Sequence, residues 1–456
     1  MNTAAMKEGS LVHENKIIFL WSMTVLLVVM NTTMFNVALP SVLQDLSLTS
    51  STTSWVVSGY SIVFAISTLT YSRLSDFIPI SRLLLLGLIL LGIASFIGWM
   101  ANTFVELLLA RLLQAAGAGS VPGLAMVLAS RYIPLSRRGK AMSLISSAAS
   151  LGFGLGPVVG GAITQALGWN YLFVVTSFTV LLLPVFYKLL PKESATQKIK
   201  FDYIGALLTA AIVTFFLLFL STLSFYFLIA SVVSLLLLWK HIHKVSVPFI
   251  QPIILQNRAY IKLLFISFIA FITHFSTLFM MPFILANIFN KEAAAIGLMI
   301  FPGAMLSAVA AQFIGRVIDR FGNIPIMMLG QALLIISTSL LALFSSVSPY
   351  WIMFAYAFMS TGFSALTSSI ANEATRILPD AQIGTGMGMY QLVQFFGGAF
   401  GVALSGMLIL WQSNLAYEAI YRNIFIGIIG SLLISVILFI RYRKNQRIVL
   451  KHQNVS

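Results

Sequence analysis

The sequence predicts an all-α integral membrane protein with fourteen transmembrane helices and both termini in the cytoplasm. Three observations lead to this prediction: the composition, the number and length of the apolar runs, and the distribution of basic residues between them. Of the 456 residues, 59% are hydrophobic and only 9% are charged, against about 25% charged residues in ordinary soluble domains. So much apolar surface excludes a water-soluble enzyme, a disordered chain and a nucleic-acid-binding domain.

The residue types available for chemistry are few. The chain has no cysteine, so no disulfide, thiolate metal site or thiol redox motif is available to it. Its 12 acidic residues and 5 histidines are scattered along the sequence, whereas an enzyme inside the membrane would need such groups in a cluster. We therefore expect no enzymatic activity, no cofactor and no metal site.

The apolar runs fall into three groups, and each run approaches the roughly 20 residues that cross a bilayer as a helix. Six runs precede a polar, basic stretch at 191–200, two lie between it and a second interruption at 241–258, and six follow. The first run is too long for a signal-peptide core and has no cleavage pattern after it, so we expect it to be retained. The predicted spans are, in order, 17–39, 51–71, 83–101, 104–128, 141–166, 169–190, 202–221, 224–240, 259–288, 294–315, 325–346, 349–372, 384–411 and 419–440.

Loop charges test this count independently. With the N-terminus inside, 24 of the 27 Lys and Arg residues fall on the cytoplasmic side; Lys291 and Arg422 fall outside, and Arg111 falls within a span. A miscounted helix would scramble this alternation, so the positive-inside rule supports the count. Topology and anionic lipid headgroups then explain the basic excess without a nucleic-acid partner. The predicted parts are an N-terminal six-helix bundle (1–190), a linker with two extra transmembrane helices (191–258), a C-terminal six-helix bundle (259–440) and a basic cytoplasmic tail (441–456).

Two predicted cytoplasmic loops resemble each other, one after the second span and one after the tenth. The first reads Ser-Arg-Leu-Ser-Asp over 72–76, and the second reads Gly-Arg-Val-Ile-Asp over 315–319. Each closes the second helix of a six-helix block, as expected for a duplicated bundle with the substrate path between its halves. An aspartate near a helix end can pair with a base on a neighbouring helix and latch one conformation; a solvated turn is the alternative. The candidate gate residues are Asp76, Arg73, Arg82, Asp319, Arg316 and Arg320.

Glycines recur along the fifth span. Gly152, Gly156 and Gly160 are four residues apart and therefore share one helix face. Such a face lets another backbone approach closely in lipid, and Pro157 can bend the helix because it removes a backbone hydrogen bond. The thirteenth span, which is the counterpart of the fifth, repeats the pattern. Plain helix packing is the alternative to a role in transport.

Arg111 is the most informative single residue. A charged side chain inside a span costs about 2.5–3.5 kcal/mol on insertion scales. Because of this cost, we expect Arg111 to have a function. Gln114 shares its helix face three residues on, whereas Glu106 lies about 140° around the helix, and we expect it to face the outer vestibule. An arginine that snorkels outward while fastening helices together is the alternative.

His274 lies in the middle of the ninth span, the counterpart of the first. Histidine titrates near physiological pH, so His274 is the first candidate for a proton carrier, and Glu106 and Asp76 are the next. Arg111 stays charged, so it can change the proton affinity of a partner but cannot carry the proton itself. A neutral core histidine bonded to a backbone carbonyl is the alternative. Further candidates for a substrate cavity, each of which could equally serve in helix packing, are Asn31, Thr32, Gln114, Tyr60, Phe275, Phe279, Tyr390, Gln391 and Gln394.

Several segments resemble the major facilitator superfamily, and in particular its branch of fourteen-helix drug:proton antiporters, with the tetracycline efflux carriers of Gram-positive bacteria as the nearest likeness. The most specific is the fifth span, which is similar to the family's antiporter signature; its matching residues are Gly152, Gly156, Pro157, Gly160 and Gly161. The other matching segments are 36–40, 74–76, 110–117, 131–134, 138–141 and 301–303, together with Asp202 and Gly205.

This resemblance implies a secondary active exporter of drugs or other amphipathic small molecules in a bacterial plasma membrane, with multidrug efflux and antibiotic resistance as its consequences. It implies alternating access, exchange of the substrate for protons, and a role for Arg111 in the proton relay or the cavity. The chain has Thr32, Phe153 and Gly398 where the tetracycline carriers have carboxylates, which favours a neutral, amphipathic or anionic substrate. We expect a monomer in contact with lipid. A non-transporting sensor, or a lipid- or partner-binding protein of the same fold, is the alternative.

Overall fold

The computed structural model describes residues 14–75, 78–133, 135–190, 202–245 and 248–453, and within these ranges the chain forms helices and no strand. Twelve helices of the described chain are long and apolar enough to cross a membrane. Two further long helices, α6 (Leu135–Leu167) and α15 (Pro349–Ile377), pack among them. The all-α, multi-pass membrane fold predicted from the sequence is therefore confirmed, while the count of fourteen spans stays a prediction.

The N-terminal group of helices follows the predicted spans with two internal breaks. Pro122 lacks the N–H that a continuous helix would need, and the fourth span divides at Gly119 into α4 and α5. The sixth span divides around a 3-10 segment that is followed by Pro184. Besides α6, the elements are α1 (Glu14–Asp45), α2 (Ser50–Leu74), α3 (Ile80–Trp99), α4 (Phe104–Ala118), α5 (Ser120–Tyr132), α7 (Tyr171–Ser177), η1 (Phe178–Leu182) and α8 (Leu183–Leu189).

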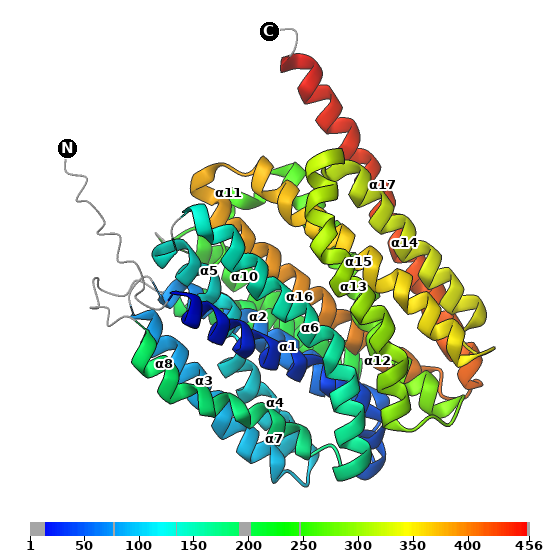
Figure 1. The fold of residues 1–456 in the computed structure, drawn as a ribbon. Helices are drawn as coiled ribbons and strands as arrows, with labels where there is room; N and C mark the ends of the chain where they lie inside the picture. The colour runs from blue at the N-terminus through cyan, green and yellow to red at the C-terminus, as the bar shows by residue number, and fades with distance from the viewer. Residues whose placement is uncertain (1–13, 76–77, 134, 191–201, 246–247, 454–456) are drawn as a thin grey trace.

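The remaining helices comprise a hairpin and a second group of six. The hairpin turns at Leu223, which has a left-handed backbone conformation (φ 53°). Helix α17 continues beyond residue 440 and extends past the rest of the bundle (Figure 1). Besides α15, the elements are α9 (Tyr203–Thr222), α10 (Phe225–Ile242), α11 (Pro252–Leu255), α12 (Arg258–Asn287), α13 (Ala293–Phe321), α14 (Asn323–Phe344), α16 (Asp380–Trp411) and α17 (Tyr417–Gln453).

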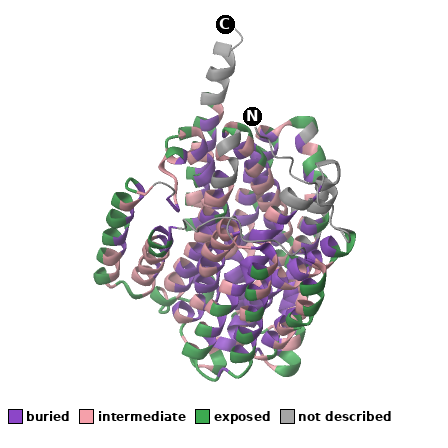
Figure 2. Ribbon diagram, turned by 90° about the vertical axis from the view of Figure 1, so that its left-hand side faces the viewer, coloured by how far each residue is buried: buried purple, intermediate pink, exposed green. Residues whose placement is uncertain are grey.

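The two groups of six helices meet along two seams, where α6 packs on α13 and α2 packs on α16. Helices α1 and α12 contact each other between these seams. Buried residues gather along the middle of the bundle and exposed residues on its outer faces (Figure 2). The α9–α10 hairpin lies outside the seam between α2 and α16: Trp55 Nε1 donates to Ser221 Oγ at 3.0 Å, and the Phe216 ring stacks on Phe400 with 6.0 Å between centroids.

Asp202 fixes the start of this hairpin. Its carboxylate accepts hydrogen bonds from the backbone N–H groups of Gly205 (2.8 Å) and Phe249 (2.9 Å), and it lies 2.6 Å from Nε2 of His241. Burial raises the pKa of Asp202, but the hydrogen bonds from these three groups outweigh burial and hold the pKa below the ordinary carboxyl value. One side chain thus joins α9, α10 and the segment leading to α11. That segment lies beside Leu69 of α2 and Leu392 of α16.

Candidate functional site

Helix α6 lies between α1 of its own bundle and α13 of the other. A Cβ atom on Gly156 would lie 2.9 Å from the carbonyl oxygen of Met30, and one on Gly160 would lie 2.6 Å from that of Met34. On the neighbouring face, Gly161 meets the backbone of Ala293. The same pattern recurs in α16, where Gly401 packs on α12 and Gly406 on α2. The glycines predicted to form a packing face therefore pack on α1 within their own bundle, whereas Gly161 and Gly406 bring the two bundles into backbone contact.

The bundles are also joined by polar contacts at the end of the molecule opposite the first turn of α1. Gln165 of α6 accepts a hydrogen bond from the backbone N–H of Ala294 (3.0 Å), and its Nε2 donates to the Glu292 carboxylate. Ser50 of α2 donates to the carbonyl oxygen of Gly406 at 3.0 Å. These hydrogen bonds therefore join the bundles along both seams at this end.

Two adjoining cavities lie between the bundles. The smaller, about 140 Å³, is lined from α1, α2, α5, α6, α12 and α16; the larger, about 300 Å³, is lined from α1, α6, α12, α13, α15 and α16. Phe153, Phe275 and Phe395 line both cavities and thus form their common wall. Neither α9 nor α10 contributes a described residue to either lining. Of the predicted cavity residues, Thr32, Tyr60 and Phe275 line the smaller cavity, and Phe275 and Gln394 line the larger. His274, the predicted proton carrier, also lines the larger cavity.

Arg111 is fully buried in a cage of aromatic and amide groups. Its guanidinium carbon lies 4.0 Å from the ring centroids of both Phe35 and Tyr60, a distance typical of cation–π contact. Its NH1 group donates to Asn31 Oδ1 (3.3 Å) and to Gln114 Oε1 (3.0 Å). None of the described contacts of Arg111 is a carboxylate. Neutral dipoles and π faces therefore compensate the buried charge.

The cage extends to residues that sequence reasoning missed. Thr176 donates to Asn31 Oδ1 at 3.0 Å, Gln114 donates to Ser95 Oγ at 2.8 Å, and Arg111 Nε donates to the Val56 carbonyl oxygen at 3.4 Å. These three partners come from three different helices. No periodicity marks a lone serine or threonine inside an apolar span, so only the packed bundle reveals them.

His274 is buried at the wall of the larger cavity. Its ring lies parallel to that of Phe363, with 4.1 Å between centroids and 8° between planes, and Tyr356 flanks it at 6.0 Å. Its Nδ1 atom is buried and has no hydrogen-bond partner among the described residues. The imidazole therefore has a buried hydrogen-bonding site that no described residue uses.

A series of ring contacts crosses the boundary between the bundles and connects Tyr60 with His274. The successive centroid distances are 5.8 Å for Tyr60–Phe64, 5.1 Å for Phe64–Phe395, 6.2 Å for Phe395–Phe271, 4.9 Å for Phe271–Phe363 and 4.1 Å for Phe363–His274. The four phenylalanines of this series were not predicted, because a chain with 36 phenylalanines offers no pattern that singles them out. The cavity walls are thus rich in aromatic rings.

Other predicted site residues are not part of the described lining of either cavity. Phe279 is fully buried and packs on Phe283, with 5.1 Å between centroids, Gln391 is exposed, and Tyr390 donates to the Thr367 carbonyl oxygen at 2.9 Å. Glu106 is exposed and caps α4: its carboxylate accepts the backbone N–H groups of Asn102 (2.8 Å) and Thr103 (3.1 Å). The structure therefore gives Glu106 a helix-capping role.

The candidate gates are described only in part. Asp76 and the side chain of Asp319 lie outside the described residues, so pairing at either aspartate stays a prediction. Arg82, Arg316 and Arg320 are exposed, and Arg73 is half-buried beside the segment leading to α11.

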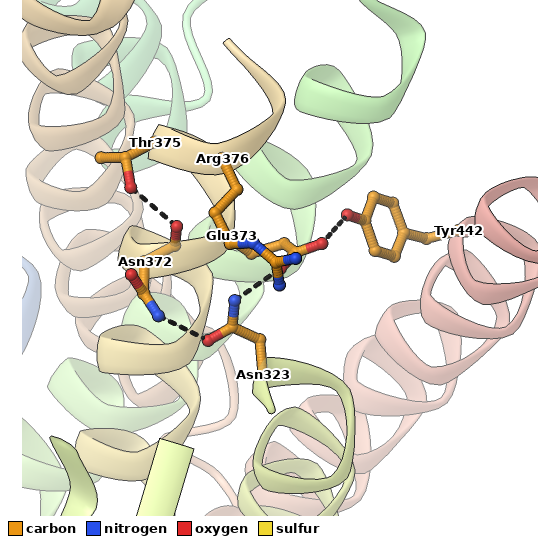
Figure 3. A network of polar contacts seen from close by, with 6 residues as sticks. All are labelled: Asn323, Asn372, Glu373, Thr375, Arg376 and Tyr442. Atoms are coloured by element: carbon orange, nitrogen blue, oxygen red, sulfur yellow. Dashed lines mark hydrogen bonds and ion pairs between the residues drawn. The ribbon is translucent and has the colours of Figure 1, made fainter. Parts of the chain in front are cut away.

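A buried carboxylate lies beside the second candidate gate loop (Figure 3). Glu373 of α15 accepts hydrogen bonds from Asn323 Nδ2 at the start of α14 and, at 2.7 Å, from Tyr442 OH of α17. Arg376 lies 3.4 Å from the same carboxylate, and Asn372 Nδ2 donates to Asn323 Oδ1 at 2.9 Å. The structure places residues 315–321 in the last turns of α13, so the prediction of a loop there is wrong. Asn323 directly follows Gly322, where α13 ends, and the network therefore ties the junction of α13 and α14 to α15 and α17. Glu373 directly follows the predicted span 349–372, and nothing in the sequence pattern indicates this network.

Comparison with known proteins agrees with this arrangement of helices. The family model described as Major Facilitator Superfamily matches residues 21–254 and 263–454. The chain belongs to this superfamily. The riboflavin transporter RibZ of Clostridioides difficile (strain 630) is 25% identical over 395 residues, covering 85% of this chain and 86% of that protein. The uncharacterized MFS-type transporter YcnB of Bacillus subtilis (strain 168) is 24% identical over 407 residues, covering 87% and 86%.

Solved structures of two transporters share the fold. A bacterial homologue of the human lysosomal transporter Spinster, in an inward-facing and occupied conformation, has a TM-score of 0.68 at 13% identity, covering 96% of this chain and 98% of that one. The POT family transporter PepTSo has a TM-score of 0.71 at 15% identity, covering 95% and 98%. With the family match and the transporter relatives, the superfamily member described here is a membrane transporter and not an enzyme.

Proposed function

We propose that this transporter is a secondary active exporter of uncharged or anionic aromatic molecules, which pass between the two bundles by alternating access. One observation carries the proposal: the described lining of both cavities is rich in aromatic rings and contains no carboxylate. A protonated amine in this cavity would lose its hydration without gaining a counter-charge. Flat uncharged rings, in contrast, gain stacking contacts there.

Riboflavin is the first compound to test, because one relative is named as a riboflavin transporter and riboflavin is an uncharged, planar ring system. Purified protein in liposomes loaded with unlabelled riboflavin should accumulate labelled riboflavin by counterflow. Phe363→Leu, which removes the ring stacked on His274, should reduce counterflow severalfold. Phe96→Leu, at an exposed position of α3, is the matched control. Counterflow no greater than in protein-free liposomes would reject riboflavin, and full counterflow in Phe363→Leu would reject this cavity as the path.

The finer assignments are parts of the same proposal. We infer fourteen spans, with helices α9 and α10 inserted between two six-helix bundles, and both chain ends in the cytoplasm of a bacterium, because this orientation places 24 of the 27 basic residues inside. Membership of the drug:proton antiporter branch rests on the glycines of α6. We also propose that the protein is a monomer surrounded by lipid.

Proton coupling is proposed through His274, the described cavity-lining side chain whose ordinary titration range is nearest to neutral pH. In liposomes, an imposed pH gradient should then accelerate substrate movement against the flow of protons. His274→Gln should retain substrate binding, because its amide still offers an acceptor, but should lose this acceleration. Unchanged acceleration in the variant would assign coupling to another residue or to a charge on the substrate.

A further inference from the structure

Hydroxyl side chains gather on one face of α15 where this helix lines the larger cavity. With 3.6 residues per turn, their positions lie within about 80° of one another around the helix and extend over about 16 Å of its length. Among the described residues, no other helix contributes more than one hydroxyl side chain to this lining. We call this surface the α15 hydroxyl face, and its members are Tyr356, Ser360, Ser364 and Thr367.

Two members of the face have hydroxyl groups that are available to a ligand. Within the described chain, neither Tyr356 OH nor Ser364 Oγ forms a hydrogen bond, and neither atom is among the unpaired polar atoms that are fully buried. Both oxygens therefore keep accessible surface, although the Tyr356 residue as a whole is only 3% exposed. A further donor comes from α16, because Gln394 donates one amide hydrogen to Ser267 Oγ at 3.1 Å and has a second.

The other two members of the face can only accept. Ser360 donates its hydrogen to the Gly303 carbonyl oxygen at 2.6 Å, and Thr367 donates to that of Phe363 at 2.8 Å, so each oxygen keeps lone pairs but no hydrogen. The polar side of the cavity therefore mixes donors with acceptors. An alcohol group both donates and accepts, so a row of alcohol groups can satisfy both kinds. A purely apolar ring would leave them without partners, which is costly for buried polar groups.

We propose that the larger cavity binds an uncharged molecule that joins a planar aromatic ring to a polyhydroxylated chain. The chain lies along the α15 hydroxyl face, and the ring packs against Phe271 and Phe275 of α12 and Phe395 of α16, which line the same cavity. A volume of about 300 Å³ is within the range of small-molecule sites. The inference rests on the proposed transport function and narrows its substrate class.

Riboflavin and lumiflavin provide a matched pair of probes. They share one ring system, but lumiflavin carries a methyl group where riboflavin carries a polyhydroxylated chain, and both are uncharged at neutral pH. Equilibrium dialysis with the full-length protein in lipid nanodiscs measures each affinity, and protein-free nanodiscs correct for partition into lipid. We expect riboflavin to bind about 30-fold more tightly than lumiflavin, the ratio that corresponds to two net hydrogen bonds.

Two substitutions on the hydroxyl face test where the chain lies. Tyr356→Phe and Ser364→Ala each remove a hydroxyl that has no partner within the described chain, so they should leave the helix packing intact. Each should weaken riboflavin binding about fivefold and leave lumiflavin binding unchanged. Tyr350→Phe makes the matching change at an exposed position of the same helix and should alter neither affinity.

Three results would overturn the inference. They are equal affinities of the wild-type protein for riboflavin and lumiflavin, the absence of binding by both, and full riboflavin affinity in both Tyr356→Phe and Ser364→Ala. The wild-type ratio decides the matter even if one variant fails to fold.

The riboflavin counterflow experiment separates this inference from the proposed function. A preference for riboflavin that depends on Tyr356, in a protein without counterflow, would retain the binding site and reject transport of the tested substrate. Counterflow by a protein that binds riboflavin and lumiflavin equally would retain the transport function and reject the hydroxyl face as a binding site.

Discussion

Tyr60 lies between Arg111 and the smaller cavity. One face of its ring is 4.0 Å from the guanidinium carbon, and the side chain lines the smaller cavity that the fully buried Arg111 does not reach. A molecule in this cavity would therefore experience the positive charge through the ring and the field around it, and not through a direct hydrogen bond. Asn31 reinforces the pair, because it accepts from Arg111 at 3.3 Å and donates to Tyr60 OH at 3.5 Å.

Arg111→Lys should destabilise the protein although it conserves the charge. An ammonium group has no planar face to stack between Phe35 and Tyr60, and it cannot reproduce the fork that reaches Asn31 and Gln114. We expect a loss of about 1–3 kcal/mol, the scale of hydrogen bonds to a charged group, measured by denaturant unfolding in detergent. Arg422→Lys, at an exposed position, is the control. Equal stability of the two variants would show that the cage contributes nothing.

Gly160→Ala should force α6 away from α1. The added Cβ would meet the Met34 backbone at 2.6–2.7 Å, and a backbone cannot rotate out of the way as a side chain can. Overpacking of this kind costs about 1–3 kcal/mol, and the thermal unfolding temperature should fall. Gly430→Ala in α17 has no heavy atom within 4 Å and should behave as wild type. An unchanged unfolding temperature in Gly160→Ala would contradict the close packing.

Asp202→Asn should loosen the α9–α10 hairpin and the segment that leads to α11. The pKa of the native carboxyl is below its ordinary value, so the ionised form stabilises the fold. That contribution is fully present above the ordinary carboxyl pKa and is lost as the pH falls through the lowered native pKa. Wild type should therefore keep this stabilisation at neutral pH, and the variant should lack it.

Hydrogen exchange of peptides covering 248–255 provides the measurement for Asp202→Asn. Faster exchange at neutral pH is expected in the variant, and Glu418→Gln, an exposed carboxylate at the start of α17, should leave it unchanged. Identical exchange in wild type and Asp202→Asn would remove the proposed link between the hairpin and this segment.

Glu373 and Tyr442 should be energetically coupled. Tyr442→Phe removes the donor 2.7 Å from the Glu373 carboxylate, and Glu373→Gln removes the charge that the network surrounds. Neighbouring residues in one network show coupling energies of about 0.5–3 kcal/mol. A double-mutant cycle on unfolding free energy measures the coupling. Strict additivity of the two substitutions would mean that the contact stabilises nothing.

Asp76→Asn tests the candidate latch after α2. A latch that is broken and re-formed in each cycle affects turnover more than binding, so we expect counterflow to slow severalfold while substrate affinity stays constant. Arg82→Lys, which conserves charge in the first turn of α3, should have the smaller effect. Normal turnover of well-expressed Asp76→Asn protein would eliminate the latch.

The sequence by itself determined the fold class, because each transmembrane helix satisfies its backbone hydrogen bonds within its own segment and must present apolar side chains to lipid. Run length and loop charge are therefore visible without any tertiary information. The same holds for Arg111 and His274, which stand out because charged or titratable groups inside apolar spans are rare. The glycine face of α6 could also be predicted from the sequence, because the spacing of the glycines defines a helix face whatever it contacts.

Only the tertiary structure decided what those residues meet. The cage around Arg111 draws Asn31, Val56 and Thr176 from helices distant in sequence, and the Phe363 stack on His274 joins α12 to α15. The side chains that line the cavities are those on the helix faces that turn toward the other bundle. In a chain this apolar, many helix faces are chemically alike, so the sequence does not distinguish them. Hydropathy therefore locates the helices, whereas interhelical packing chooses the few side chains that form the site.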